Sequence, residues 1–336
     1  MALQALKEMD FITHDREYFD TIYPWAGMRR VAVAPNKEIK GIHHPDDTSK
    51  WEDGSSVNWS TYESNGWNCM VQIPKFWYKS VMGTLNGKKT FRWFISDEPK
   101  KGFKVHPAFV RNGVEQDYQY LSAFEGSLIG GKLRSLPNKS VQAGRKRGQF
   151  RTDAQANGSG WEQQDFLITC AVQLLYLLEY GHFDSQTKIG RGYVDGNSSH
   201  LQTGSTLSNG NNTFGETTGK KPMSYRGIEN LWGNYYKWVD GINIKDRVAF
   251  IADSNFADDK FTDNYKSVGF TNWTSSGYGG DIGFAENCDF AFLPIAGGGS
   301  SSSKLYDYYW QNSGPRVACF GGHRSSGSGA GAFYWN

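Results

Sequence analysis

The side chains that most often carry out covalent chemistry are few and widely separated in this sequence. The four cysteines, Cys69, Cys170, Cys288 and Cys319, form no CxxC motif, and no Cys–His or Ser–His–Asp arrangement is evident. We therefore expect buried free thiols, although the sequence leaves a disulfide between Cys288 and Cys319 open. The prediction is a protein that is not an enzyme.

Metal coordination has equally weak support in the spacing of histidines and carboxylates. The densest cluster is His43-His44 with Asp46-Asp47, in a polar segment that predicts a solvated loop. A calcium site is a second alternative, but the spacing is not that of an EF-hand; its candidate ligands are Asp240, Asp246, Asp253 and Asp258. We expect no metal and no cofactor.

Residues 297–336 have instead the composition of a recognition surface. Glycine and serine are interleaved there with aromatic residues, namely Tyr306, Tyr308, Tyr309, Trp310, Phe320, Phe333, Tyr334 and Trp335. A flexible linker would contain the glycine and serine without the aromatics. Tyrosine and tryptophan supply contact area at low entropic cost, and serine and glycine supply adaptable hydrogen bonding. This region is therefore predicted to bind a ligand.

Charge and hydropathy exclude several classes of partner. The net charge of the 336 residues is +2, so we expect neither nucleic acid nor a membrane as partner. A short basic patch at 144–151 (GRKRGQFR) predicts a solvated surface or the start of a helix. The chain has no apolar run of 18 residues, and its first residues lack the apolar core of a signal peptide.

Hydrophobic periodicity predicts a few firm elements. Residues 161–180 should form a buried helix, with Ser159 as N-cap and Gly181 as the stop. Strands at 70–81 and 90–96 should form a hairpin around Asn86-Gly87. Residues 185–222 predict a long exposed, mobile loop. Later short strands are expected at 248–251, 289–293, 316–320 and 332–335.

Two segments resemble a known family. Residues 227–234 read GIENLWGN and are followed by WVDG at 238–241, which is similar to the glutamate–tryptophan–glycine–asparagine signature of the formylglycine-generating-enzyme branch of C-type lectin folds. From Arg316 onward, RVACFGGHRSSGSGAGAF resembles the variable region of proteins diversified by retroelements, many of which are phage or prophage tail proteins. Formylglycine-generating enzymes use a close pair of cysteines near the C-terminus, whereas this chain has only Cys319 there.

The resemblance implies an α+β, C-type-lectin-like fold of the formylglycine-generating-enzyme subclass with long loop insertions. It implies an N-terminal segment, 1–65, for attachment to a larger particle, and a ligand-binding domain, 66–336, with a variable region at about 297–336. The implied function is receptor binding at a phage or prophage tail tip, in the virion. Its partners would be a host-surface protein or glycan, with other tail proteins or self-association. The alternatives are an enzyme of the resembled type and an invariant tail or baseplate component.

The resemblance also implies which residues vary. Adenine-directed change of asparagine codons yields Tyr, Ser, Pro, Cys, His, Arg, Asp or Gly, but not Trp, Gln or Lys. The ligand-binding positions would then be Tyr308, Tyr309, Ser313, Pro315, Cys319, His323, Arg324, Ser325 and Ser326. The fixed scaffold would comprise Glu229, Trp232, Gly233, Asn234, Trp238, Trp310, Gln311, Gly321, Gly322 and Phe333–Trp335. We expect residues 323–326 to be exposed and near Tyr308 or Tyr309.

Overall fold

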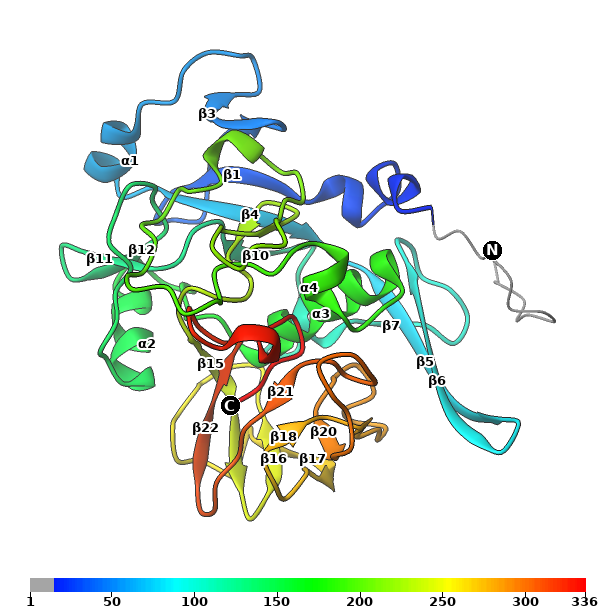
Figure 1. The fold of residues 1–336 in the computed structure, drawn as a ribbon. Helices are drawn as coiled ribbons and strands as arrows, with labels where there is room; N and C mark the ends of the chain where they lie inside the picture. Colours follow the sequence, from blue (N-terminus) through cyan, green and yellow to red (C-terminus); the bar gives the residue numbers. More distant parts are fainter. Residues whose placement is uncertain (1–14) are drawn as a thin grey trace.

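The computed structural model describes residues 15–336 and has a mixed α+β architecture of small antiparallel sheets (Figure 1). The largest sheet has five strands in the order β10-β4-β1-β2-β3, and every pairing in it is antiparallel. Its strands are β1 (Arg29–Val33), β2 (Ile39–His44), β3 (Asp47–Trp51), β4 (Asn68–Pro74) and β10 (Tyr118–Ser122). The sheet therefore crosses residue 65, where the sequence analysis placed the end of an N-terminal segment. Helix α1 (Trp59–Asn65) joins β3 to β4.

The predicted hairpin is confirmed as β5 (Trp77–Leu85) and β6 (Lys88–Ser96). Asn86 and Gly87 both have positive φ, 50° and 72°, as a two-residue turn of the primed type requires. The expected strand at 70–81 is divided in two, because β4 ends at Pro74 and β5 begins in another sheet, next to β7 (Lys104–Val105). Figure 1 shows the tip of this hairpin projecting from the body.

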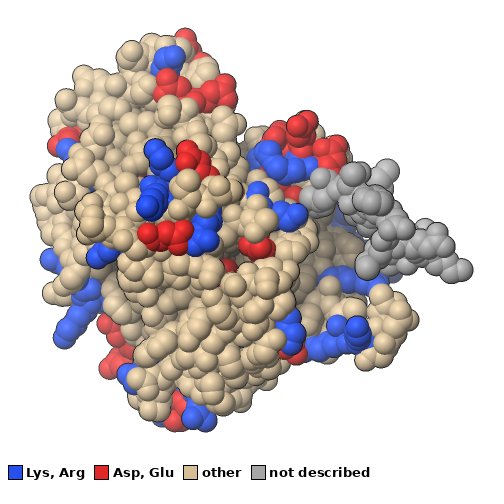
Figure 2. Space-filling model, in the orientation of Figure 1, with Lys and Arg blue, Asp and Glu red and all other residues tan. Residues whose placement is uncertain are grey.

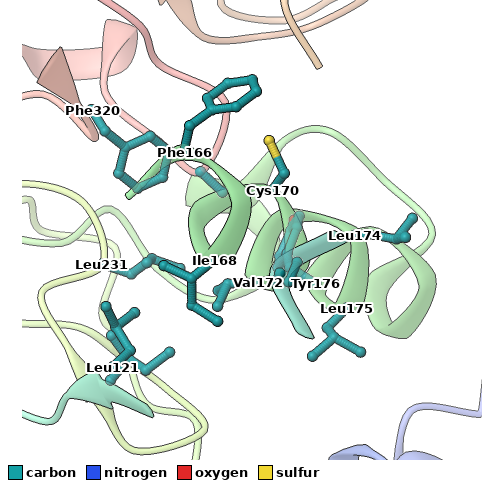
Figure 3. Close-up of a cluster of buried hydrophobic side chains, with 14 of the residues drawn as sticks. Leu121, Phe166, Ile168, Cys170, Val172, Leu174, Leu175, Tyr176, Leu231 and Phe320 are labelled. Atoms are coloured by element: carbon teal, nitrogen blue, oxygen red, sulfur yellow. The ribbon is translucent and has the colours of Figure 1, made fainter. Parts of the chain in front are cut away.

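The central helix, α3 (Phe166–Tyr180), begins five residues later than expected. Its N-cap is Asp165, whose side chain accepts hydrogen bonds from the backbone N–H groups of Leu167 and Ile168, so the expectation of Ser159 was wrong. Gly181 ends the helix in the left-handed conformation, as predicted. The helix is buried along most of its length (Figure 3).

Helix α3 packs against the C-terminal end of the chain. The rings of Phe166 and Trp335 have their centroids 5.6 Å apart, and the side-chain amide of Gln173 donates to the Ala332 carbonyl at 2.7 Å. Figure 3 shows Phe166 of the helix beside Phe320 of β22. The last residues are thus part of the main core. The expected strand at 332–335 is absent, and the only β contacts there are isolated bridges at Trp335.

The second large sheet has the strand order β17-β16-β15-β22. Its members are β15 (Lys237–Lys245), β16 (Val248–Ile251), β17 (Lys266–Thr271) and β22 (Arg316–Phe320), which confirms the strands expected at 248–251 and 316–320. Residues 289–293 are buried but irregular, so the strand expected there was wrong. Smaller two-stranded units are β8 (Val110–Arg111) with β9 (Val114–Glu115), β11 (Ser127–Ile129) with β12 (Lys132–Arg134), β13 (Ser224–Tyr225) with β14 (Ile228–Glu229), β18 (Gly277–Tyr278) with β21 (Tyr308–Tyr309), and β19 (Asp281–Ile282) with β20 (Pro294–Ala296).

Residues 185–222 are irregular but packed onto the rest of the chain. Their regular structure consists of α4 (Ser185–Lys188) and the 3-10 turn η4 (Leu207–Asn209). Val194, Thr203 and Thr206 are buried. The expectation of surface exposure over most of this segment was wrong, because buried polar groups elsewhere bind its backbone, as described below. The other short helical elements are η1 (Glu17–Asp20), η2 (Trp25–Gly27), η3 (Pro107–Phe109), α2 (Arg147–Gln155) and η5 (Gly327–Gly329).

The basic patch binds two of the four aspartates considered for calcium, Asp240 and Asp258. Arg147 and Arg151 lie in α2, and Arg151 contacts carboxylate oxygens of Asp240 at 2.5 Å and Asp258 at 2.6 Å. Arg147 is buried and approaches Asp258 at 3.0 Å. The patch is thus the start of a helix, one of the two alternatives. Among residues 15–336, no helix is long and apolar enough to cross a membrane.

We predict that Leu174→Ala lowers the free energy of unfolding by about 2–5 kcal/mol, because Leu174 is fully buried in α3 and its truncation leaves a cavity. Denaturant unfolding measures this change. Leu85→Ala, at the exposed hairpin tip, is the matched control and should change stability by less than about 0.5 kcal/mol. Equal effects in the two variants would show that α3 is not the central core element.

Candidate ligand-binding surface

The 227–234 motif forms a buried turn that leads into β15. Asn230, Gly233 and Asn234 all have positive φ, which asparagine and glycine tolerate better than other residues. A side chain on Gly233 would press on Tyr193 and Val194, since its Cβ would lie 3.0 Å from their atoms. Trp232 is fully buried, and its indole N–H donates to the Arg191 carbonyl at 3.1 Å. The motif therefore holds the backbone of the 185–222 segment from inside.

A buried carboxylate, Glu125, connects this motif to the preceding sheet. Its Oε2 accepts hydrogen bonds from the side-chain amides of Asn230 at 3.0 Å and Asn234 at 2.5 Å. The Lys237 ammonium lies 3.2 Å from Oε1 and also donates to the carbonyls of Gly233 and Tyr235. Burial lowers the pKa of Lys237, and the neighbouring Glu125 opposes that shift. Asparagines at 230 and 234 can therefore satisfy a charge that would otherwise be costly to bury.

Asn234 also accepts hydrogen bonds from two surface segments. Its side-chain oxygen accepts from the Leu201 N–H at 2.9 Å, and its backbone carbonyl accepts from the Arg324 N–H at 3.1 Å. Residues 321–329, which we call the C-terminal loop, are also tied to the 185–222 segment. The Gly327 N–H donates to the Val194 carbonyl at 2.9 Å, and Arg324 donates to the Asn197 carbonyl. An irregular loop is thus fixed along its length by hydrogen bonds.

Glu229 fixes another part of the 185–222 segment. Its carboxylate accepts from the N–H groups of Gly204 at 2.9 Å and Thr206 at 2.7 Å, and from the Thr206 hydroxyl at 2.8 Å. The Arg30 guanidinium donates to the same hydroxyl at 3.0 Å. Burial raises the pKa of Glu229, while Arg30 and these hydrogen bonds oppose the shift. Asn230 acts in a similar way, because its side-chain oxygen accepts from the Met223 N–H at 3.4 Å.

The remaining motif residues differ in their burial. Trp238 is half-buried, pairs with Cys319 across β15 and β22, and donates from its indole to the Arg145 carbonyl at 3.1 Å. Gly321 and Gly322 have φ of 84° and 74°, and a Cβ on Gly321 would lie 2.8 Å from the Leu231 carbonyl oxygen. Glycine is therefore required for the close approach of the C-terminal loop to the motif. Phe333 is buried in the core.

Aromatic side chains flank the C-terminal loop on two sides. The His323 ring stacks on Tyr236, with centroids 4.5 Å apart and an interplanar angle of 20°. The Ser328 hydroxyl lies 3.1 Å from the Tyr278 hydroxyl, and the Tyr278 ring contacts Tyr308 edge-on at 5.4 Å. We call this surface the aromatic patch; it comprises Tyr236, Tyr278, Tyr308, His323, Arg324, Ser325 and Ser328. Burial and the adjacent Arg324 lower the pKa of His323.

The aromatic patch contains part of the site expected from the sequence. In the C-terminal loop, Ser325 is exposed, whereas His323, Arg324 and Ser326 are half-buried. Tyr308 of β21 lies beside Gly329 of this loop. Tyr309 and Cys319 are buried, 4% and 8% exposed, so they do not present side chains to a ligand. Their burial follows from the pairing of Tyr309 with Gly277 and of Cys319 with Trp238.

Ser313 and Pro315 are exposed but lie at the opposite end of β22 from the C-terminal loop. Five strand residues separate the two places, a distance of roughly 16 Å along an extended strand. Trp310, expected in the scaffold, is 42% exposed, and its backbone N–H donates to the Trp335 carbonyl at 2.9 Å. Gln311 is held by hydrogen bonds to Ser276 and Thr274. The nine predicted positions therefore do not form one surface.

The sequence analysis missed two tyrosines of the patch and the segment that supports it. Tyr236 follows directly after the 227–234 motif, and Tyr235 beside it stacks on His200, with centroids 3.6 Å apart. A pair of tyrosines immediately after the turn was the available signal. Tyr278 and Asn197 gave no such signal, because only the fold brings them to the C-terminal loop.

The thiol and imidazole groups considered for chemistry are buried. All four cysteines are free and buried, and burial raises the pKa of Cys319 to about 12. His43 accepts from the Tyr62 hydroxyl at 2.6 Å and donates to the Thr48 carbonyl at 2.8 Å, the tautomer that satisfies both partners. Burial lowers the pKa of His43 to about 4. It is a core residue and not part of a solvated loop.

Comparison with known proteins found no matching family model and no similar curated protein.

We predict that Asn234→Gly lowers the free energy of unfolding by about 2–4 kcal/mol. The substitution removes one hydrogen bond to the buried Glu125 carboxylate and one from the Leu201 N–H. Glycine keeps the positive φ, so the loss isolates the side-chain hydrogen bonds. Asn138→Gly is the matched control, since Asn138 has φ of 57° and an exposed side chain. Chemical denaturation of both variants should separate them; equal stability would refute the role of Asn234.

A third buried carboxylate, Asp307, binds the backbone of the last residues. Its Oδ2 accepts from the Phe333 N–H at 2.7 Å, and a Cβ on Gly331 would lie 2.2 Å from Oδ1. Burial raises the pKa of Asp307 well above its ordinary value. A raised pKa in the folded state contributes stability that is complete below the unfolded pKa, about 3.9, and is lost as pH rises toward the folded pKa.

We predict that Asp307→Asn gains stability relative to the wild type as pH rises from about 4 to about 8, because the amide carries no charge to be buried. The amide oxygen can still accept from the Phe333 N–H. Melting temperatures across this pH range test the prediction, with Asp97→Asn at an exposed position as control. A pH-independent difference between Asp307→Asn and wild type would contradict it.

Proposed function

We propose that this chain is a receptor-binding protein whose aromatic patch recognises a ligand on a host surface. Support comes from a surface built of tyrosine, histidine, arginine and serine, the residue types that provide contact area and hydrogen bonding at low entropic cost. Tyr236 provides contact area, because it is 38% exposed and stacks on His323, and the serine and arginine side chains of the patch provide hydrogen-bonding groups. Tyrosine and arginine are also frequent anchors of binding energy at interfaces.

The single observation that carries this proposal is the separation between the loop's backbone and its side chains. The backbone is fixed by hydrogen bonds to Asn234, Val194 and Asn197, whereas the side chain of Ser325 is exposed and its hydroxyl contacts Arg324 of the same loop at 3.4 Å. A surface of this kind can change its side chains without changing its shape. Diversification by a retroelement demands such a surface, and the resemblance of residues 227–241 and 316–333 to that family agrees with it.

Within this proposal the fold is a C-type-lectin-like domain of the formylglycine-generating-enzyme subclass, and the protein acts at the tail tip of a phage or prophage. Binding is favoured over catalysis because the Cys319 thiol is buried and protonated, which makes it a poor nucleophile. Figure 2 shows a broad uncharged area over β21 and β22, with charges of both signs gathered elsewhere on this face. An uncharged surface suits a protein or glycan ligand better than nucleic acid.

The proposal is tested by replacing Tyr236, His323 and Arg324 together with alanine. Binding of labelled protein to intact cells from a panel of bacterial strains, measured by flow cytometry, should fall at least about tenfold on each strain that the wild type binds. The melting temperature should stay within about 4 °C, because these side chains are not in the core.

The matched control replaces Leu85, Lys88 and Arg92, three exposed residues of the β5–β6 hairpin, and should bind as the wild type does. Equal cell binding by the patch variant and the wild type, or absence of binding to every strain, would contradict the proposed function. The DNA next to the gene gives an independent test. A reverse transcriptase gene and a near-copy of the 3′ coding segment that differs at adenines are expected there.

A further inference from the structure

A cleft of about 560 Å³ opens between the five-stranded sheet, α2 and the start of β15, behind the aromatic patch. Its volume lies within the range of small-molecule sites. Strand β10 forms one wall, residues 160–165 before α3 form another, and residues 235–238 line the side nearest the patch. The proposed function does not use this cleft, although Tyr236 belongs to both places.

Two pairs of charged groups that line the cleft are already matched. Glu125 faces Lys237 at 3.2 Å, and Asp165 accepts from Arg111 at 2.9 Å. The Lys237 ammonium has three oxygen partners, which use all three of its protons. A charged ligand would therefore meet no unpaired opposite charge at these positions. An uncharged ligand fits them better, because it leaves both ion pairs intact.

The buried side-chain atom at the cleft wall that has no partner among residues 15–336 is an acceptor. Gln163 is 7% exposed; its amide nitrogen donates to the Trp238 carbonyl at 2.8 Å, and its side-chain oxygen has no hydrogen-bond partner among residues 15–336. Glu125 Oε1 at the same wall is matched by the Lys237 ammonium at 3.2 Å. Buried acceptors such as the Gln163 oxygen are normally satisfied. The cleft therefore calls for a ligand that donates hydrogen bonds.

Aromatic residues make up much of the rest of the cleft wall, because Tyr120, Trp161, Tyr235, Tyr236 and Trp238 all line it. Aromatic rings offer large contact areas to C–H groups. A ligand that combines hydroxyl donors, no charge and apolar ring faces is a saccharide. We propose that this cleft binds a mono- or disaccharide unit without a metal ion.

Because Tyr236 belongs to both the cleft and the aromatic patch, one ligand can occupy the two places together. A glycan with its terminal ring in the cleft would extend over Tyr236 onto His323 of the aromatic patch. This extension rests on the proposed function, whereas sugar binding in the cleft does not. The host-surface ligand is then a glycan. The cleft binds its terminal sugar, and the aromatic patch binds the sugar units that follow.

The test uses the full chain and free sugars in a buffer containing EDTA. Saturation-transfer NMR against glucose, galactose, N-acetylglucosamine, rhamnose, lactose and maltose should reveal binding of at least one, and calorimetry then gives its Kd. Gln163→Leu, which removes the free acceptor, should raise that Kd at least about tenfold. Ser122→Phe, which fills the cleft from β10, should abolish binding. Melting curves identify any variant that fails to fold, and the remaining variant then decides.

His323→Ala with Arg324→Ala is the control, because neither residue lines the cleft. This double variant should bind the free sugar as the wild type does and lose binding to cells. The cleft assignment is overturned if no sugar of the panel binds, or if sugar binding survives both Gln163→Leu and Ser122→Phe. Cell binding that survives the double variant while the sugar still binds in the cleft would refute the patch and support the cleft.

Discussion

The buried Glu125 carboxylate is the interaction on which the candidate surface depends. It receives two asparagine amides and faces one lysine ammonium, and these partners come from a turn more than 100 residues away in sequence. A buried carboxylate without partners is very costly, so the turn at 230–237 must stay where it is once the protein folds. Asn234 then holds the C-terminal loop and the 185–222 segment through its own oxygen atoms.

This arrangement explains how a chain rich in glycine and serine can present an ordered surface. Regular secondary structure near the patch is sparse: β21 has two residues and the C-terminal loop has one short 3-10 turn. Hydrogen bonds from buried side chains to loop backbone replace the missing strand pairing, as with Glu229 at Gly204 and Thr206. The exposed side chain of Ser325 takes only a small part in these networks, through a 3.4 Å contact with Arg324. Shape and recognition are therefore assigned largely to different residues, although the Arg324 side chain, which binds the Asn197 carbonyl, belongs to both groups.

Features set by local sequence could be predicted. The hairpin at Asn86-Gly87, the end of α3 at Gly181 and strands β16 and β22 follow from turn chemistry, capping and residue preference. The start of α3 was misplaced because Ser159 and Asp165 are both good N-caps, and only the packed structure selects Asp165. The burial of Tyr309 and Cys319 depends on strand register, which a single sequence does not reveal. The hydrogen bond between Asn234 and Glu125 could not be predicted either, because it joins segments that are distant in the sequence.

One measurement tests the division between scaffold and surface most directly. A library with every single substitution at Glu125, Asn234, His323, Arg324, Ser325 and Ser328 can be displayed on yeast and sorted for resistance to protease, which reports folding without any ligand. The account predicts that most substitutions at the four patch positions remain folded, whereas nearly all at Glu125 and Asn234 are lost. Equal sensitivity of the two groups, or tolerance at Glu125 and Asn234, would contradict it.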